Sequence, residues 1–299
     1  FRRFGKSDVQ RSQSDDMANP DILFRGIPRG PVRGYIARIL ASVEPTRVVI
    51  PCCGSFSLAE VARVAGVPMS GVICGDISLY SSAIGYAITD QDWRLEINTG
   101  REDSQIAKIV RPHLSDPLSK AAAVLYVIRV LQYEERASKV HYRERMRELL
   151  INADEYLASF KDQLAEMAHR FEGLEYLACD MWETISLYRD DLDAVMIVDP
   201  PWYTGGYDRM FRGANEFFDW DEPDATQFAE DDYSSMMQVL GESKALVLVF
   251  KRGDLTRLGP LRGKLARALE ERTGKRVHMV EGDVDGGPEL EEPSAEPGM

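Results

Sequence analysis

The sequence predicts a doubly wound α/β fold, in which a mainly parallel sheet carries helices on both faces. Five short apolar segments of strand composition alternate with helical patterns. They lie at residues 46–51, 71–76, 174–180, 194–198 and 245–250. Three of these segments end in an acid, at Asp76, Asp180 and Asp199. Ligands of such sheets bind at the carboxyl ends of the strands, so we expect a polar site along that edge.

The composition is ordinary for a soluble globular protein. The chain has 299 residues, of which 44% are hydrophobic and 28% charged, enough for one large or two small domains. No apolar run approaches a membrane span and no signal sequence opens the chain, so we expect a cytoplasmic protein without membrane contact. Four cysteines and four histidines show no paired metal-ligand spacing. We therefore expect no metal site.

The charge is negative overall and unevenly distributed. The formal net charge is −13, which argues against a generic nucleic-acid binder because phosphate contacts need cations. Residues 281–299 hold seven acids and no Lys or Arg, whereas residues 1–40 hold eight cations and four acids. A basic cleft on an acidic body and a mixed, solvated surface both fit this distribution.

The segment Asp199-Pro200-Pro201-Trp202 carries the clearest chemistry. It follows a buried apolar strand, so the carboxylate and two peptide units without N–H donors lie at the sheet edge. A carboxylate and carbonyls accept hydrogen bonds, and an indole offers a flat face. This combination suits an exocyclic amine on a planar ring. The reaction it suggests is attack by that amine on an electrophile, with Asp199, Pro200, Pro201 and Trp202 as the catalytic residues.

This segment resembles motif IV, the Asp-Pro-Pro-aromatic signature of S-adenosylmethionine-dependent amino-methyltransferases, above all the DNA adenine-N6 enzymes. The resemblance implies a Rossmann-like methyltransferase sheet and S-adenosylmethionine as the cofactor. A strand end that happens to carry a Pro-Pro turn is the simpler alternative.

The first predicted strand runs into the turn Cys52-Cys53-Gly54-Ser55-Phe56 and a helix at residues 58–65. Glycine allows close approach of a ligand to the backbone, and the helix start offers free N–H groups. The turn resembles motif I, usually Phe-x-Gly-x-Gly. Gly54 matches the first glycine, Cys52 replaces the aromatic residue, and Phe56 stands at the second glycine. Phe56 would narrow the cofactor site, shift the turn or mark a protein without activity.

Two further acids fit a nucleoside cofactor. Asp76 follows the glycine turn by about twenty residues, the usual spacing of a carboxylate that binds ribose hydroxyls. The resemblance places Asp180 at the adenine amine of the cofactor, with Met181 or Trp182 lining the adenine pocket. Capping of the following helix is the alternative for both acids. The predicted cofactor-binding residues are Pro51, Cys52, Gly54, Ser55, Asp76, Ile77, Asp180 and Met181.

The expected organisation is a mobile N-terminal arm at residues 1–21, a methyltransferase domain at 22–280 and a disordered acidic tail at 281–299. A helical insertion at about 101–173 contains a buried helix at 121–131. An amphipathic stripe follows from Met146 to Phe171, with cations among glutamates on its other face. Target recognition, partner binding and a simple helical cap all fit this insertion.

Residues 203–224 have no clear period, so we expect an irregular segment beside the site. Its large aromatic residues would stack on an extruded base, close a lid or pack the segment onto the domain. They are Phe211, Phe217, Phe218 and Trp220.

The resemblance implies an enzyme that methylates the N6 amine of adenine in DNA after the base is flipped, of a phage or restriction-modification type. RNA, the N4 amine of cytosine and a protein amide are alternatives within the same class. A second hypothesis, motivated by Phe56 and Cys52, is a methyltransferase fold without activity that binds DNA or a partner. The oligomeric state is not predicted.

Overall fold

The computed structural model describes residues 30–200, 206–225, 228 and 232–249. Every structural statement below refers to these residues. Several predicted features lie outside them: the N-terminal arm, Pro201 and Trp202, the acidic tail, and a basic helix at residues 258–272 and a short strand at 276–280 that the sequence also predicts. The chain divides into two compact units. We call residues 28–76, 173–206 and 224–249 the sheet unit, and residues 77–172 and 207–223 the helical unit.

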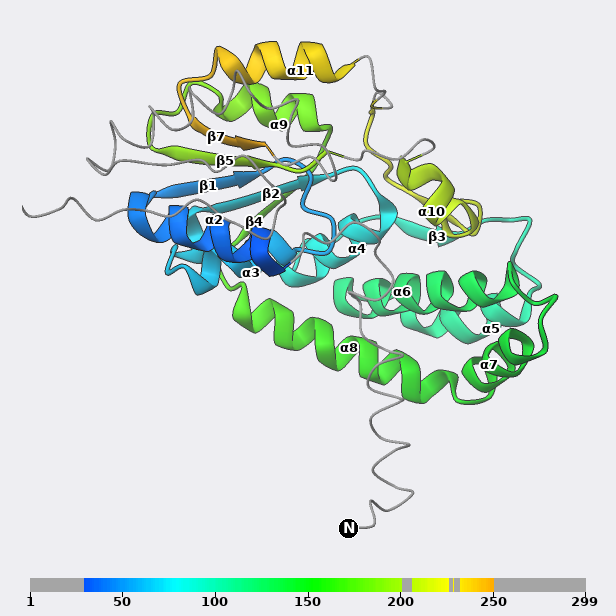
Figure 1. Cartoon of the computed structure of the whole chain (residues 1–299). Helices are drawn as coiled ribbons and strands as arrows, with labels where there is room; N and C mark the ends of the chain where they lie inside the picture. The colour runs from blue at the N-terminus through cyan, green and yellow to red at the C-terminus, as the bar shows by residue number, and fades with distance from the viewer. Residues whose placement is uncertain (1–29, 201–205, 226–227, 229–231, 250–299) are drawn as a thin grey trace, which may run out of the picture. The chain divides into compact units, whose positions relative to one another are not determined.

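The sheet unit contains five parallel strands, which confirms the predicted fold class (Figure 1). They are β1 (Arg47–Ile50), β2 (Val72–Asp76), β4 (Glu175–Ala178), β5 (Ala194–Val198) and β7 (Leu246–Val249). Their order is β4-β2-β1-β5-β7. The order reverses between β1 and β5, and such a reversal is where open α/β sheets bind ligands.

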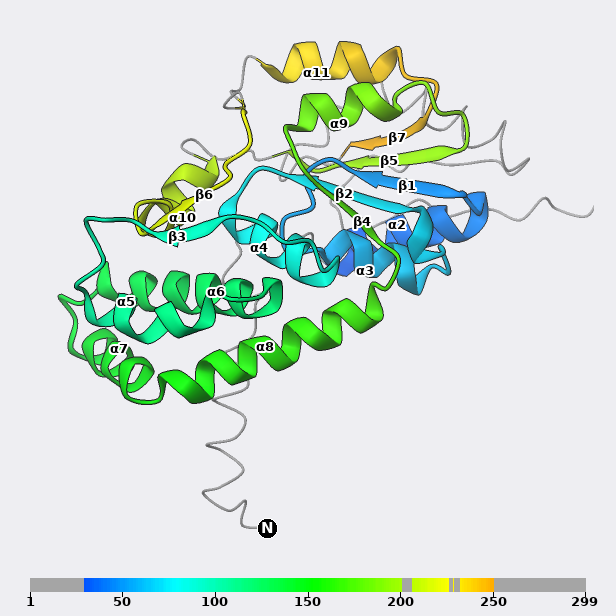
Figure 2. The same ribbon diagram turned by 180° about the vertical axis from the view of Figure 1, so that it is seen from behind.

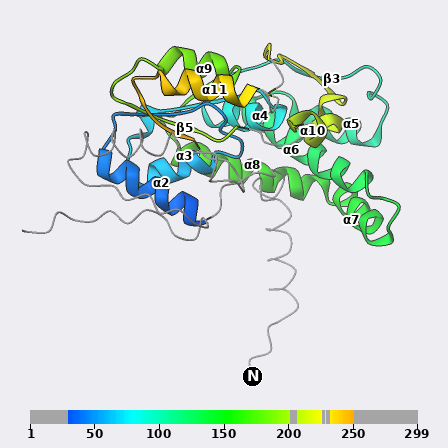
Figure 3. The same cartoon turned by 45° about the horizontal axis from the view of Figure 1, so that its top comes forward.

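Helices cover both faces of this sheet (Figure 1). Beside one face lie α2 (Gly30–Val43) and α3 (Ser57–Val64). On the other lie α9 (Met181–Tyr188) and α11 (Asp232–Gly241), which Figures 1 and 3 both place side by side. Met181 and Ile185 of α9 and Met236 and Leu240 of α11 share one apolar cluster with alternate residues of the strands. A sheet buried on both faces explains why its strands read as continuous apolar runs.

Gly75 permits the close packing of α9 on β2. A Cβ atom at Gly75 would lie 2.6 Å from Oγ1 of Thr184, inside any normal contact distance. Thr184 is fully buried in α9, and its Oγ1 also lies 3.1 Å from Sγ of Cys179. Glycine within a strand marks such a close approach. Gly75 thereby fixes how near the start of α9 comes to the end of β2.

We predict that Gly75→Ala lowers the free energy of unfolding by about 1–3 kcal/mol, because overpacking must displace Thr184 or the α9 backbone. Gly34→Ala is the matched control. Gly34 lies inside α2, where a Cβ atom would come no closer than 3.9 Å to another group, so alanine should raise stability by up to about 1 kcal/mol. Urea titrations measure both changes. Equal effects of the two variants would contradict the packing argument.

The helical unit consists of α-helices and one small ribbon (Figure 2). The helices are α4 (Leu79–Ile88), α5 (Gln105–Val110), α6 (Pro117–Glu134), α7 (Val140–Ile151), α8 (Ala153–Arg170) and α10 (Gly206–Asn215). Two 3₁₀ turns occur among the described residues, at Met69–Gly71 in the sheet unit and at Arg111–His113 here. Helix α6 is apolar on all sides, and the predicted segment 121–131 is buried throughout.

The amphipathic stripe does not form one helix. It is divided between α7 and α8 by Asn152, which has φ −105° and ψ 30° and ends one helix while it caps the next. The three- and four-residue spacing of apolar side chains continues across the break, so periodicity alone did not reveal it.

The segment after Asp199 is more regular than predicted. It contains α10 and strand β6 (Phe218–Trp220), which pairs antiparallel with β3 (Leu95–Ile97). The aromatic side chains are buried in the helical unit, so the packing alternative holds for them. Phe211 stacks on Tyr80 at 5.2 Å, and Trp220 meets Trp93 edge-on at 6.2 Å. Phe217 and Phe218 are each 1% exposed.

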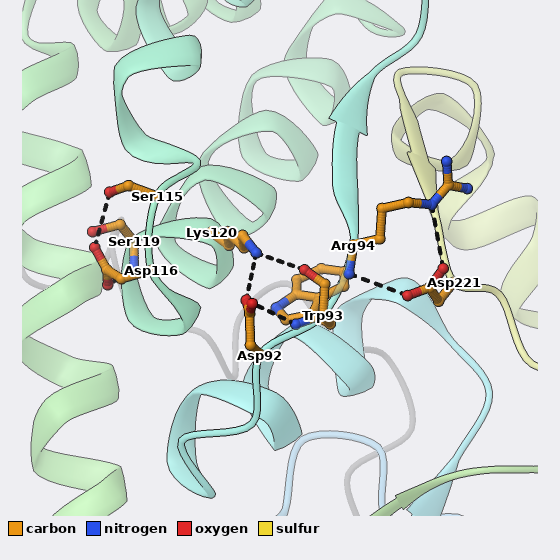
Figure 4. A network of polar contacts seen from close by, with 8 residues as sticks. All are labelled: Asp92, Trp93, Arg94, Ser115, Asp116, Ser119, Lys120 and Asp221. Carbon is orange, nitrogen blue, oxygen red and sulfur yellow. Dashed lines mark hydrogen bonds and ion pairs between the residues drawn. The ribbon is translucent and has the colours of Figure 1, made fainter.

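Polar contacts connect the β3–β6 ribbon to α6 (Figure 4). The buried Lys120 of α6 donates to the Asp92 carboxylate at 2.7 Å and to the Trp93 carbonyl at 2.6 Å. Asp221, just after β6, accepts from the Arg94 backbone N–H at 3.1 Å and from its Nε at 3.3 Å. The hydrogen bond from Lys120 holds the pKa of Asp92 below its usual value. The network satisfies a buried cation, as burial of a charge requires.

Among the described helices, none combines the length and the apolar character needed to cross a bilayer.

Candidate functional site

The turn after β1 follows the predicted cofactor-binding pattern. Pro51 is buried, and the Cys53 N–H donates to the Gly75 carbonyl at 3.0 Å, which joins the turn to β2. Gly54 has φ 53°, in the left-handed region that glycine adopts readily. The Phe56 N–H closes the turn by donating to the Cys53 carbonyl at 2.9 Å. Helix α3 then starts at Ser57.

Asp76 connects this turn to the end of β2. Its side chain is 2% exposed, and its Oδ2 accepts from the Gly54 N–H at 2.9 Å. Its carbonyl accepts from the Tyr176 hydroxyl of β4 at 3.1 Å. Asp76 thus spans the ends of β1, β2 and β4. Ile77, also predicted to bind cofactor, follows Asp76 and is half-buried.

The charges of the three strand-end acids act on Cys52. Burial, and then the charges of Asp76, Asp199 and Asp180 in that order, raise the pKa of its thiol well above the usual value. All four residues belong to the sheet unit. The acids that the sequence placed at the ends of three strands therefore lie near enough to Cys52 to influence its thiol. The high pKa keeps Cys52 a neutral thiol at physiological pH, so it is no nucleophile.

Asp180 caps helix α9. Its carboxylate accepts from the Trp182 N–H at 2.8 Å, so the capping alternative holds for this residue. Capping leaves Asp180 close enough to Cys52 to influence the thiol. Met181, predicted beside it in the site, is 7% exposed and belongs to the apolar cluster under α9 and α11.

Ser55 presents a buried hydroxyl in the same turn. The residue is 4% exposed, and its Oγ has no hydrogen-bond partner in the part of the chain that the structure describes. A buried hydroxyl without a partner costs free energy, so each such group calls for an explanation. A polar ligand held in the turn would supply the missing hydrogen bond.

Phe56 adopts a backbone conformation that favours glycine. It has φ 63° and ψ 14°, the left-handed conformation, at the N-cap of α3. Its ring is 1% exposed and lies 5.9 Å from the ring of Tyr176. The three outcomes expected for Phe56, a narrowed cofactor site, a shifted turn and a protein without activity, stay predictions.

Asp199 directly follows β5, which pairs with β1 at the point where the strand order reverses. Asp199 is half-buried and Pro200 is buried. The other two residues of the predicted amine-binding segment, Pro201 and Trp202, lie outside the described residues. No group of three or more His, Cys, Asp or Glu side chains suited to a metal ion occurs among the residues described.

Sequence reasoning missed two residues that shape the site, Gly75 and Tyr176. Gly75 was a recognisable signal, since a glycine inside an apolar strand indicates close backbone approach. Tyr176 gave no local signal, because its hydrogen bond joins residues 100 positions apart in the chain.

The reversed strand order, the glycine turn and the acids at the strand ends define an α/β protein of the Rossmann-like methyltransferase type. A family model described as phage DNA adenine methylase-like domain 1 matches residues 24–282, and the chain belongs to this family. A search of curated proteins found no significant match. The family confirms the predicted relation to DNA adenine methylases.

The charges around Cys52 predict how its thiol reacts. Because the pKa is raised, alkylation by iodoacetamide should be slow at pH 7 and accelerate only as the pH rises above the usual thiol range. Asp76→Asn removes one of the charges that disfavour the thiolate, so the pH profile should shift to lower pH. Peptide mapping by mass spectrometry resolves Cys52 from the other cysteines. Asp92→Asn, in the other unit, is the control, and an equal shift there would refute the predicted proximity.

Phe56 allows a test of the left-handed conformation. Phe56→Gly loses the buried ring, a cost of about 3–5 kcal/mol for truncation of a core Phe, but relieves about 1–2 kcal/mol of backbone strain. Phe56→Ala loses the ring and keeps the strain. We therefore expect both variants to be destabilised, with alanine the worse by about 1 kcal/mol in urea unfolding. An alanine variant as stable as the glycine variant would contradict a left-handed residue 56.

Proposed function

We propose that this protein transfers a methyl group from S-adenosylmethionine to the N6 amine of adenine in DNA. The observation that carries the proposal is the glycine turn at the reversal of strand order, with Asp76, Asp180 and Asp199 at strand ends near enough for their charges to act on Cys52. Membership of a DNA adenine methylase-like family supports adenine in DNA over RNA, cytosine and protein amides.

The chemistry of the site fits a cationic nucleoside cofactor. The charges of three carboxylates disfavour a negative charge at Cys52, and the same field favours a positively charged ligand nearby. S-adenosylmethionine carries a sulfonium and an ammonium group. The hydroxyl of Ser55, buried without a partner, offers a further hydrogen bond in the turn. Pro51, Cys52, Gly54, Ser55 and Asp76 would hold the cofactor from the β1 and β2 ends.

If Asp76 binds the ribose, its carboxylate must accept hydrogen bonds both from the Gly54 N–H and from the ribose hydroxyls. Its Oδ2 already accepts from the Gly54 N–H, which orients the carboxylate. Ribose hydroxyls would bind to this preoriented acid. In the same way Asp180 would receive the adenine amine while it caps α9 and is held in place by the Trp182 N–H. Met181, which follows Asp180 and packs in the apolar cluster, would support the adenine pocket from beneath.

Asp199 and Pro200 would act on the target amine. The Asp199 carboxylate and the Pro200 carbonyl would accept hydrogen bonds from its two N–H groups. These hydrogen bonds would raise the electron density of the nitrogen lone pair and orient the lone pair toward the methyl group. Pro201 restricts the backbone, and Trp202 stacks on the flipped base. The bound cofactor supplies an activated methyl group. Alignment of the amine with that group accounts for most of the acceleration, and no covalent intermediate with Cys52 is required.

The decisive experiment separates cofactor binding from methyl transfer. S-adenosylmethionine should bind in calorimetry, and labelled methyl groups should appear on adenine in mixed-sequence DNA. We predict that Asp199→Ala lowers the transfer rate by at least about 10²-fold, as expected for loss of a group that acts on the reacting atoms, with little change in cofactor affinity.

Asp193→Ala is the matched control, since Asp193 is an exposed acid just before β5 and should leave the rate unchanged. Wild-type activity in Asp199→Ala would remove Asp199 from the mechanism. Absence of S-adenosylmethionine binding in the wild type would refute the proposed enzymatic activity. The second hypothesis, a methyltransferase fold that binds DNA or a partner without catalysis, would then be favoured. The ring of Phe56 in place of glycine is the observation that favours that second function.

A further inference from the structure

Positive charge gathers at the corner between α6 and α7, although the chain as a whole is acidic. Residues 136–147 contain five Lys or Arg and one acid, in a protein whose formal net charge is −13. The cations are Arg136, Lys139, Arg143, Arg145 and Arg147. We call these five residues, with Tyr133 and Tyr142, the basic corner. In Figure 2 the corner joins the end of α6 to α7.

Three of the cations form a row. Arg143 and Arg147 lie four residues apart on one face of α7, about 6 Å apart along its axis, and Lys139 stands at the N-cap position just before the helix. All three are exposed. Lys139 and Arg147 make no ion pair within the described parts of the chain, and Arg143 donates only to the Ala137 carbonyl, at 3.0 Å.

Acids close in the sequence offset part of the charge of the basic corner. Arg145 is paired with Glu148 at 2.7 Å, so these two charges offset each other. The remaining exposed acids are Glu134 and Glu135 at the end of α6 and Glu144 on α7.

Two tyrosines lie between the guanidinium groups. The guanidinium carbon of Arg129 lies 5.2 Å from the ring centre of Tyr133, and that of Arg136 lies 5.6 Å from the ring centre of Tyr142. The two rings are 5.9 Å apart. Arg129 is 8% exposed, and its Nε has no hydrogen-bond partner within the described residues. This buried cation adds positive potential beneath the corner. Cations interleaved with aromatic rings are typical of nucleic-acid surfaces.

Burial does not account for the composition of α7. Of its twelve residues only Leu149 is buried, while the apolar Val140 and Ile151 at its ends are 60% and 67% exposed. A helix with so little core contact gains little stability from packing. Its outer face is therefore available to a polyanion.

We propose that the basic corner binds the phosphate backbone of DNA through Lys139, Arg143 and Arg147, with Tyr133 and Tyr142 beside the sugar and bases. This inference rests on the proposed function in that it takes DNA as the substrate, and it assigns the contact to α7. Cations at steps of about 6 Å along one helix face engage more than one phosphate of a strand.

The test measures affinity for a labelled mixed-sequence duplex by fluorescence anisotropy over a range of salt concentrations, with full-length protein. Each phosphate contact contributes about 0.9 to the slope of log K against log salt. The double variant Arg143→Gln, Arg147→Gln should therefore flatten the slope by about 1.8. Arg143→Lys, Arg147→Lys keeps both charges and should keep the slope.

The matched control is Arg63→Gln, Arg170→Gln, which removes two charges from α3 and the end of α8 and should leave the slope unchanged. Thermal melting verifies that all variants fold. An unchanged slope of log K against log salt in the Arg143→Gln, Arg147→Gln variant would overturn the proposal that the basic corner binds DNA. An acidic protein partner would then be the favoured ligand of this surface. Methyl transfer by the wild type is measured on the same preparations. If the wild type methylates DNA but the slope is unchanged in the variant, only the basic corner proposal fails and the proposed function stands. A wild type that binds no DNA overturns both.

Discussion

The hydrogen bond between the Gly54 N–H and the Asp76 carboxylate is the contact on which the rest of the site depends. It fixes the turn after β1 against the end of β2, and it does so with a side chain that is almost completely buried. A buried carboxylate is stable only when its oxygens are satisfied by donors. Movement of the turn would break this buried hydrogen bond, which restrains the backbone around Ser55 and Phe56.

The same edge accumulates negative charge. Three acids follow three different strands, and the parallel sheet brings them to one end near Cys52. Carboxylates that act together in this way favour a positively charged ligand, as the proposed function requires. In the helical unit, α7 instead carries three arginines and two glutamates. Under the two proposals the negative edge binds the cofactor and α7 binds DNA, and the net negative charge of the chain gives no sign of the second role.

Much of this was readable in the sequence, and the failures have physical causes. The strands of the sheet were predicted because burial on both faces makes them continuous apolar runs, and their terminal acids stood out. Strands β3 and β6 were missed because three residues give no measurable alternation. The break at Asn152 was missed because the apolar spacing continues through it. The left-handed backbone of Phe56 depends on tertiary packing, which no local pattern encodes. The glycine inside β2 indicates a close approach, but the sequence does not identify Thr184 as the neighbour.

The pairing of β1 with β5 has a consequence for how the chain acquires its structure. Residues 47 and 194 are partners in adjacent strands, and the whole helical segment from residue 77 to 172 lies between them in the chain. Contacts between such distant residues form slowly because loop closure costs entropy. During synthesis, β1 and β2 emerge long before β5, so β1 lacks its second neighbouring strand until β5 has been made. Helices α4 to α8 are complete by then, whereas α10 and β6 of the helical unit emerge only after β5, so the acid-lined edge is one of the last features to assemble.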